Sequence, residues 1–109
     1  MSKAYALDGS EIKPLATGHG SCIASDRITV DGRPVGFMYR ERTDSDLDSG
    51  WRFMAGDESD EYLANPDNFG LHDVNTVANY DPAIVPLLTA PIGNAYMRDE
   101  AGRLATVNH

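Results

Sequence analysis

Only one cysteine, Cys22, occurs in the sequence, so the chain cannot form an internal disulfide and nothing points to an oxidising compartment. Apolar residues never run for the roughly 20 positions that a membrane-spanning helix needs. The N-terminus also lacks the apolar core of a signal peptide. We therefore expect a cytoplasmic protein, and its 109 residues have the length of one domain with one core.

Basic residues are also scarce: nine Lys and Arg residues stand against 17 Asp and Glu residues, a formal net charge of −8. A protein that binds a phosphate backbone or an anionic membrane surface needs the opposite balance. We therefore expect neither nucleic acid nor a membrane as partner; a basic protein is the partner that such a field attracts. Residues 41–73 hold ten of the acids and two of the bases, so this segment accounts for the whole net charge.

Strands are predicted by short apolar runs and by two-residue alternation of apolar and other residues. They fall at residues 21–25, 35–42, 51–54, 94–98 and 104–107. A polar loop over 43–50 separates the second from the third, so we expect these two to pair antiparallel, with Trp51 and Phe53 on one core-facing side. Another apolar run, 28–30, precedes Asp31-Gly32-Arg33-Pro34, which indicates a turn between two apolar runs.

Short helices are expected between these strands. Acidic residues before Tyr62 and the proline that follows Asn65 predict a helix at about 58–64, and residues 68–70 are expected to form a turn. Asp73 is placed to begin a second helix, whose apolar residues over 74–78 have the spacing i, i+3, i+4. Asp81-Pro82 is placed to begin a third helix, which a proline at 86 shortens or distorts.

The order of these elements predicts an α+β domain over residues 20–109. We expect a small antiparallel sheet, with two or three short helices between the third and later strands. Residues 1–19 show no clear period and are expected to form an N-terminal arm or an edge strand.

Three aspartates, Asp44, Asp46 and Asp48, have the spacing of the first calcium ligands of an EF-hand. The glycine of that motif comes one place late, however, and Ala55 stands where a glutamate must complete the site. Carboxylates in such numbers do not by themselves indicate general acid–base catalysis. We therefore expect no metal, no cofactor and no catalytic residue.

Cys22 is the only candidate nucleophile of the thiol type. His19 lies three positions before it, but no second ligand pair completes a zinc site. A dyad of Cys22 with His72 is possible in principle, whereas a buried, inert thiol is the more common fate of a cysteine in an apolar strand. Two arginines on neighbouring strands, Arg40 and Arg52, are expected to pair with nearby acids.

Two acidic stretches, the loop 43–50 and the helix start 57–61, flank the strand that contains Trp51. If they lie at opposite ends of that strand, they border one region of the surface. Such stretches are either solvated loops that keep the protein soluble or a surface that docks a basic protein. On the second interpretation the partner-binding residues are the acids of both stretches: Asp44, Asp46, Asp48, Asp57, Glu58, Asp60 and Glu61.

Several motifs in combination are similar to those of a known bacterial family. They are Cys22-Ile-Ala-Ser25, Val35-Gly-Phe-Met-Tyr-Arg40-Glu, Asp48-Ser-Gly-Trp51-Arg-Phe, Gly56-Asp-Glu, Glu61-Tyr-Leu63, Asn75-Thr, Asp81-Pro82, Pro86-Leu-Leu88, Pro91-Ile-Gly93 and Arg98-Asp99. Over about residues 20–99 the chain resembles the immunity protein thirty-three family, formerly an uncharacterised domain family. The resemblance implies a role in a polymorphic toxin system and brings no catalytic or toxin-contacting positions with it.

The leading hypothesis is therefore a non-enzymatic immunity protein that neutralises a cognate, basic toxin through its acidic surface. The alternative is a general protein-interaction or regulatory domain with another partner. A small metal-dependent hydrolase that uses the acidic loops is the third hypothesis. No heptad or comparable pattern specifies an oligomeric state.

Overall fold

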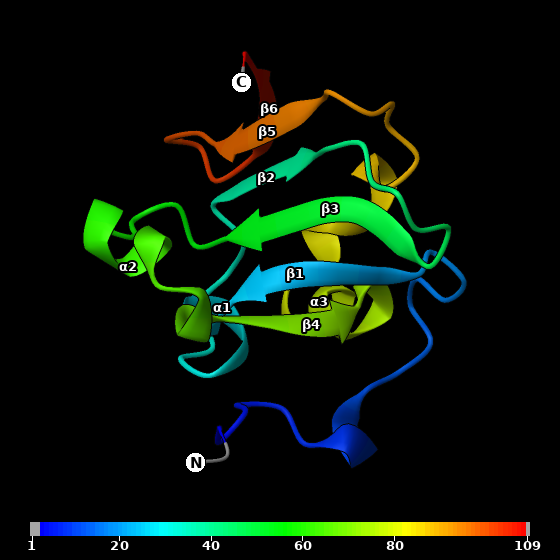
Figure 1. The fold of residues 1–109 in the computed structure, drawn as a ribbon, viewed down its shortest axis with the longest axis vertical. Coiled ribbons are helices and arrows are strands. Elements are labelled where there is room, and N and C mark those ends of the chain that lie inside the picture. Colours follow the sequence, from blue (N-terminus) through cyan, green and yellow to red (C-terminus); the bar gives the residue numbers. More distant parts are fainter. Residues whose placement is uncertain (1–2, 109) are drawn as a thin grey trace.

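A six-stranded sheet forms the centre of the computed structural model, which describes residues 3–108 and leaves 1, 2 and 109 outside the described residues. Its strand order is β4-β1-β3-β2-β5-β6 (Figure 1). Only β1 and β3 run parallel; the other neighbours are antiparallel, including the predicted pair β2 and β3. The strands are β1 (Ser21–Ser25), β2 (Phe37–Arg40), β3 (Asp48–Met54), β4 (Phe69–Asp73), β5 (Ala95–Arg98) and β6 (Leu104–Val107).

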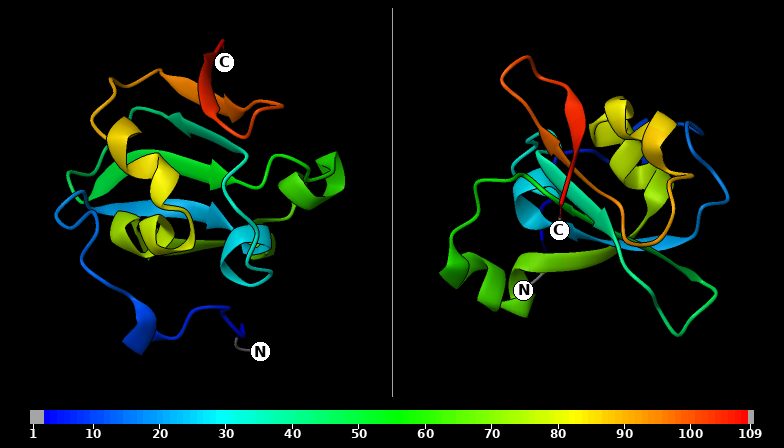
Figure 2. Two further views of the ribbon diagram at one scale, coloured as in Figure 1. Left: turned by 180° about the vertical axis from the view of Figure 1, so that it is seen from behind. Right: turned by 90° about the horizontal axis from the view of Figure 1, so that it is seen from above.

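The helices are short and lie mainly on one side of the sheet. They are the α-helices α1 (Asp26–Thr29), α2 (Asp60–Ala64) and α3 (Val74–Tyr80), and the 3-10 helices η1 (Gly9–Glu11), η2 (Pro66–Asn68) and η3 (Pro82–Leu87). Seen from behind and from above, α3 and η3 cover one face, whereas α2 projects from the other (Figure 2). We call these the helix side and the open face. The predicted α+β class is confirmed.

The core lies on the helix side, where every second residue of the central strands points. Trp51 and Phe53 of β3 are buried with Met38 of β2, and the two β3 rings stack with their centroids 6.0 Å apart. The prediction that Trp51 and Phe53 share a core-facing side is confirmed. From the helices they meet the apolar side chains of Ile28, Val74, Val77, Ile84 and Leu88.

One local prediction is wrong, and one apolar run forms an element that was not specified. Ile28 and Thr29 of the run 28–30 lie in helix α1, because the Ser25 hydroxyl accepts a hydrogen bond from the Arg27 backbone N–H and so caps a helix directly after β1. The predicted turn remains: Gly32 has φ +76°, and its N–H bonds to the Ile28 carbonyl at the helix end.

Residues 68–70, expected to form a turn, instead lead into β4, the edge strand that pairs with β1. The local sequence signal is weak because β4 contains a glycine and exposes Leu71. Long-range pairing with β1, five residues in register, decides the conformation.

The predicted helices at 58–64 and 81–88 form with small differences. Ser59 caps α2, so that helix begins at Asp60. Asp81 caps η3, in which Pro82 occupies the first turn and Pro86 lies within the helix. A proline has no N–H to donate, and the segment is a 3-10 helix rather than an α-helix.

Residues 3–20 contain no strand and run past β4 toward α3 as an arm (Figure 1). Two asparagines one helical turn apart on α3 hold it. The Asn75 side chain accepts hydrogen bonds from the N–H groups of Leu15 and Ala16 and donates one to the Lys13 carbonyl. The Asn79 side chain bonds to both backbone groups of Lys13.

Replacing Asn75 by alanine is expected to loosen the arm without unfolding the sheet. Three hydrogen bonds to the backbone are lost, so the free energy of unfolding should fall by about 1–3 kcal/mol. Amide hydrogen exchange at Leu15 and Ala16 should accelerate. Asn108→Ala, an exposed asparagine, is the control; equal exchange in both variants would contradict the assignment.

Candidate partner-binding surface

The two acidic stretches lie at opposite ends of β3. The loop from β2 to β3 and the segment leading into α2 both project on the open side of the sheet, away from α3 and η3 (Figure 2). They therefore border the open face from two ends. The seven acids proposed from the sequence divide into three that have structural partners and four that do not.

Asp48 is held by Arg52. The Arg52 guanidinium is buried on the open face and donates from Nη1 and Nη2 to the two Asp48 oxygens, both at 2.9 Å, and from Nε to Glu41 at 2.6 Å. Asp48 also accepts the Gly50 N–H. The Arg52 hydrogen bonds hold the pKa of Asp48 below its usual value, so this carboxylate stabilises the fold rather than awaiting a partner.

Arg52 thus pairs with acids, as predicted, but Arg40 does not. Its guanidinium donates to the backbone carbonyls of Ser49 and Ala90. It also lies 5.8 Å from the centroid of the Trp51 ring, close enough for a cation–π interaction.

Asp57 and Glu58 also have structural partners. The Asp57 carboxylate forms ion pairs with Arg27 and Arg33, with nitrogen–oxygen distances of 2.9 and 3.0 Å. The Glu58 carboxylate accepts the backbone N–H groups of residues 55 and 56 and closes the turn after β3. Both side chains fix the segment that leads to α2.

The remaining four acids are exposed and form no ion pair with any side chain of the described residues. Asp44 and Asp46 lie in the β2–β3 loop, and Asp60 and Glu61 form the first turn of α2. Across residues 3–108, no Lys or Arg side chain forms an ion pair with any of them. They are the part of the predicted set that is available to a partner.

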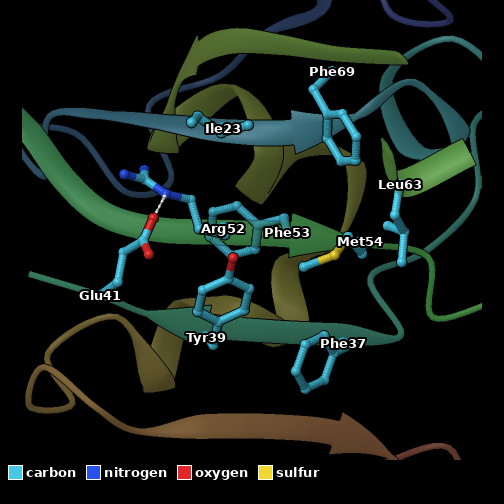
Figure 3. A pocket seen from close by; sticks show the side chains of 9 residues that line it. All are labelled: Ile23, Phe37, Tyr39, Glu41, Arg52, Phe53, Met54, Leu63 and Phe69. Atoms are coloured by element: carbon cyan, nitrogen blue, oxygen red, sulfur yellow. Dashed lines mark hydrogen bonds and ion pairs between the residues drawn. The ribbon is translucent and has the colours of Figure 1, made fainter. Parts of the chain in front are cut away.

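Between the two acidic ends lies an apolar groove in the open face (Figure 3). Its volume is about 390 Å³, and it continues past Ile23, Leu63 and Phe69 into a second hollow of about 470 Å³ that Leu71 borders. The Glu41–Arg52 ion pair lies at one end of it and Leu63 of α2 at the other (Figure 3). The apolar lining comes from four strands and α2: Ile23, Phe37, Tyr39, Met54, Leu63 and Phe69.

This groove was not predicted from the sequence. The alternation that places Phe37 and Tyr39 on one face of β2 was visible, but it cannot show which face the helices cover. Met38 is the β2 residue in the core, whereas Phe37 and Tyr39 are half-buried on the open face. The signal in the sequence that could have indicated the groove is that β2 has apolar residues on both of its faces.

Cys22 and His72 face each other across β1 and β4, which brings together the dyad considered from the sequence. Burial raises the pKa of the Cys22 thiol to about 12 and lowers the pKa of His72 below its usual value. Proton transfer from this thiol to this imidazole is therefore strongly unfavourable. Cys22 is fully buried, as the inert-thiol prediction stated.

Neither a metal site nor a membrane span is found in the described part of the chain. Within residues 3–108, no three His, Cys, Asp or Glu side chains are grouped so that they could hold a metal ion. No helix in the same range is long and apolar enough to cross a bilayer.

Residues 22–108 match a family model described as the Immunity protein Imm33 domain. The chain is a member of the Imm33 family. No match was found among curated proteins or among solved structures. The match covers the sheet and its helices and begins after the arm and its η1 turn.

The motif residues of this Imm33 domain are structural. Gly50 has φ +87°, and a Cβ there would lie 2.2 Å from the Glu41 carbonyl oxygen, so only glycine fits. The Trp51 indole N–H donates to the Leu88 carbonyl. Asp81 pairs with Arg98 and accepts the backbone N–H of residue 35. These contacts build the fold.

Asp48→Asn in the Imm33 chain is expected to lower the free energy of unfolding by about 2 kcal/mol at pH 7, because Arg52 loses half of its charged partners. The pKa of Asp48 is lower in the folded state than its ordinary 3.8, so the carboxylate stabilises the fold above about pH 4. That stabilisation disappears as the pH falls through the folded-state pKa.

Urea titrations of wild type and Asp48→Asn should therefore converge below about pH 4. Asp46→Asn is the matched control, since the Asp46 side chain forms no ion pair with any of residues 3–108, and its effect should stay within about 0.5 kcal/mol. A pH-independent difference between wild type and Asp48→Asn would contradict the assignment.

The Cys22 thiol is expected to be unreactive in the folded protein. With its pKa raised to about 12 and no exposure, it should not react with a disulfide reagent such as DTNB at pH 8, yet should react fully in urea. The rate of thiolate release, followed by absorbance, measures this. Rapid labelling without denaturant would show that the β1–β4 edge opens.

Proposed function

We propose that this protein is a non-enzymatic immunity protein that acts in the cytoplasm, where it binds a cognate toxin and blocks it. Membership of the Imm33 family, over residues 22–108, is the observation that carries the proposal. Inhibition by an immunity protein requires a binding surface and no chemistry. Burial raises the pKa of the Cys22 thiol and lowers the pKa of His72, so this pair is unsuited to nucleophilic catalysis, which fits that requirement.

The charge distribution supports a basic toxin as partner. The net charge is −8, and four exposed carboxylates at the two ends of β3, Asp44, Asp46, Asp60 and Glu61, form no ion pair among residues 3–108. Proteins that act on nucleic acid bind it through Lys and Arg. An acidic protein can occupy such a cleft in place of the phosphates, and its field accelerates the encounter.

The proposal is tested by growth rescue. A toxin-like protein encoded beside the gene is expressed in bacterial cells with and without this chain. We expect growth to stop with the toxin alone and to resume with both, together with a complex that survives gel filtration. Growth arrest that persists at equal expression of a folded immunity chain would refute the assignment.

Neutralising the exposed acids is expected to slow association with the toxin. The double variants Asp44→Asn/Asp46→Asn and Asp60→Asn/Glu61→Gln should each reduce the association rate constant and weaken its salt dependence. Combining the two should reduce the rate constant by roughly 10-fold at low salt. Asp31→Asn/Glu100→Gln removes the same charge elsewhere on the surface.

Stopped-flow binding at two ionic strengths distinguishes the variants. If the control slows association as much as the two test pairs, only the net charge matters and the acidic ends of β3 have no special role.

A further inference from the structure

The groove on the open face presents apolar side chains to solvent between two acidic ends. Ile23, Phe37, Met54 and Phe69 form its lining from four strands. On β4, Leu71 is 73% exposed, and it borders the continuation of the groove. Single exposed leucines are common, but a continuous apolar groove with exposed leucine at its border is typical of an interaction site.

The charges at its ends indicate what the occupant must carry. Asp44 and Asp46 lie at the start of β3, and Asp60 and Glu61 lie beyond its end, all without a cation of this chain among the described residues. The free energy of carboxylates that border an apolar surface falls when cations lie beside them. Complementarity therefore requires positive charge at both ends of the occupant and apolar groups in its middle.

We propose that this groove is the docking site for a segment of the toxin that has an apolar centre and a Lys or Arg residue near each end. The inference rests on the proposed function and adds the chemistry by which the toxin is recognised. Strand β3 has seven residues and is about 20 Å long. A segment of that length has about six residues when extended or about 13 when helical.

Arg52 does not change this charge requirement, although it lies in the floor of the groove. Its guanidinium is only 8% exposed and is already hydrogen-bonded to Glu41 and Asp48. An acidic group on the toxin would have to displace one of these carboxylates and would meet four more at the ends of the groove.

A second copy of this chain is the competing occupant, and its charges do not fit. In a symmetric dimer the same patch faces itself, so the acidic ends of one groove would lie against the acidic ends of the other. Like charges placed together oppose association. A basic partner has no such penalty.

The test compares two serine double variants in binding to the purified toxin domain. Leu63→Ser/Leu71→Ser removes apolar side chains that are 42% and 73% exposed in the groove region. Leu15→Ser/Ile92→Ser removes two that are 44% and 51% exposed and do not line the groove. Thermal melting of both shows whether each variant is folded.

We expect the groove variant to lose toxin affinity by roughly 10-fold or more, mainly through faster dissociation, with little change in the salt dependence of association. The control variant should bind as wild type does. In hydrogen exchange of the complex, the protected toxin segment should be apolar at its centre and basic near each end.

The outcomes separate this inference from the proposed function. If wild type does not bind the toxin, the proposed function fails and the inference fails with it. If the toxin binds wild type and the groove variant equally, or if the protected segment lacks basic ends, the groove assignment is overturned while the immunity role stands. A wild-type dimer in sedimentation that only the groove variant dissociates would make a second copy the occupant and also overturn it.

Discussion

The indole of Trp51 lies between the central strand of the sheet and helix η3, and its one polar atom donates to the Leu88 carbonyl. A buried tryptophan contributes much apolar area but must find a partner for its N–H, so η3 can cover the sheet only in a register that presents this carbonyl. Phe53 and Tyr96 contact the same ring, and the Arg40 guanidinium lies over its face. The position of the helical layer therefore depends on this single side chain.

A sheet that helices cover on one face exposes its other face to water, and in this chain that second face is covered only at one end. The helices α3 and η3 cover the helix side, whereas α2 is five residues long and reaches only one end of the open face. Salt bridges hold the floor at Arg52 and the turn at Asp57. Asp44, Asp46, Asp60 and Glu61, which form no ion pair within residues 3–108, lie at the two ends of this uncovered face, so charge and apolar surface occur together there.

Much of the fold followed from local signals in the sequence. The hairpin of β2 and β3, the capped start of α3 at Asp73 and the final hairpin each rest on alternation, a cap or a turn within a few residues, and all three form. The misassigned segment 68–70 depends on a long-range contact instead, because β4 exists where β1 lies beside it. Helix α1 rests on a local signal, the cap at Ser25, which the sequence interpretation did not use.

The candidate site was predictable in part. Counting charges located the acidic segment, but it could not show that Asp48, Asp57 and Glu58 have partners within the chain. Side-chain partners depend on distances between strands that a sequence does not contain. The groove was beyond prediction for a related reason, since Phe37 and Met38 are equally apolar and only the covering helices decide which of them faces solvent.

The period of the β-strand has a consequence for what a substitution in this chain can change. In β2 and β3 neighbouring residues meet different demands: Met38 and Phe53 are constrained by close packing in the core, whereas Phe37 and Met54 line the groove on the open face. A substitution at Phe37 or Met54 should therefore reshape the groove and leave the core as it is. Arg52 is the exception, because it is buried on the open face and bound to two acids.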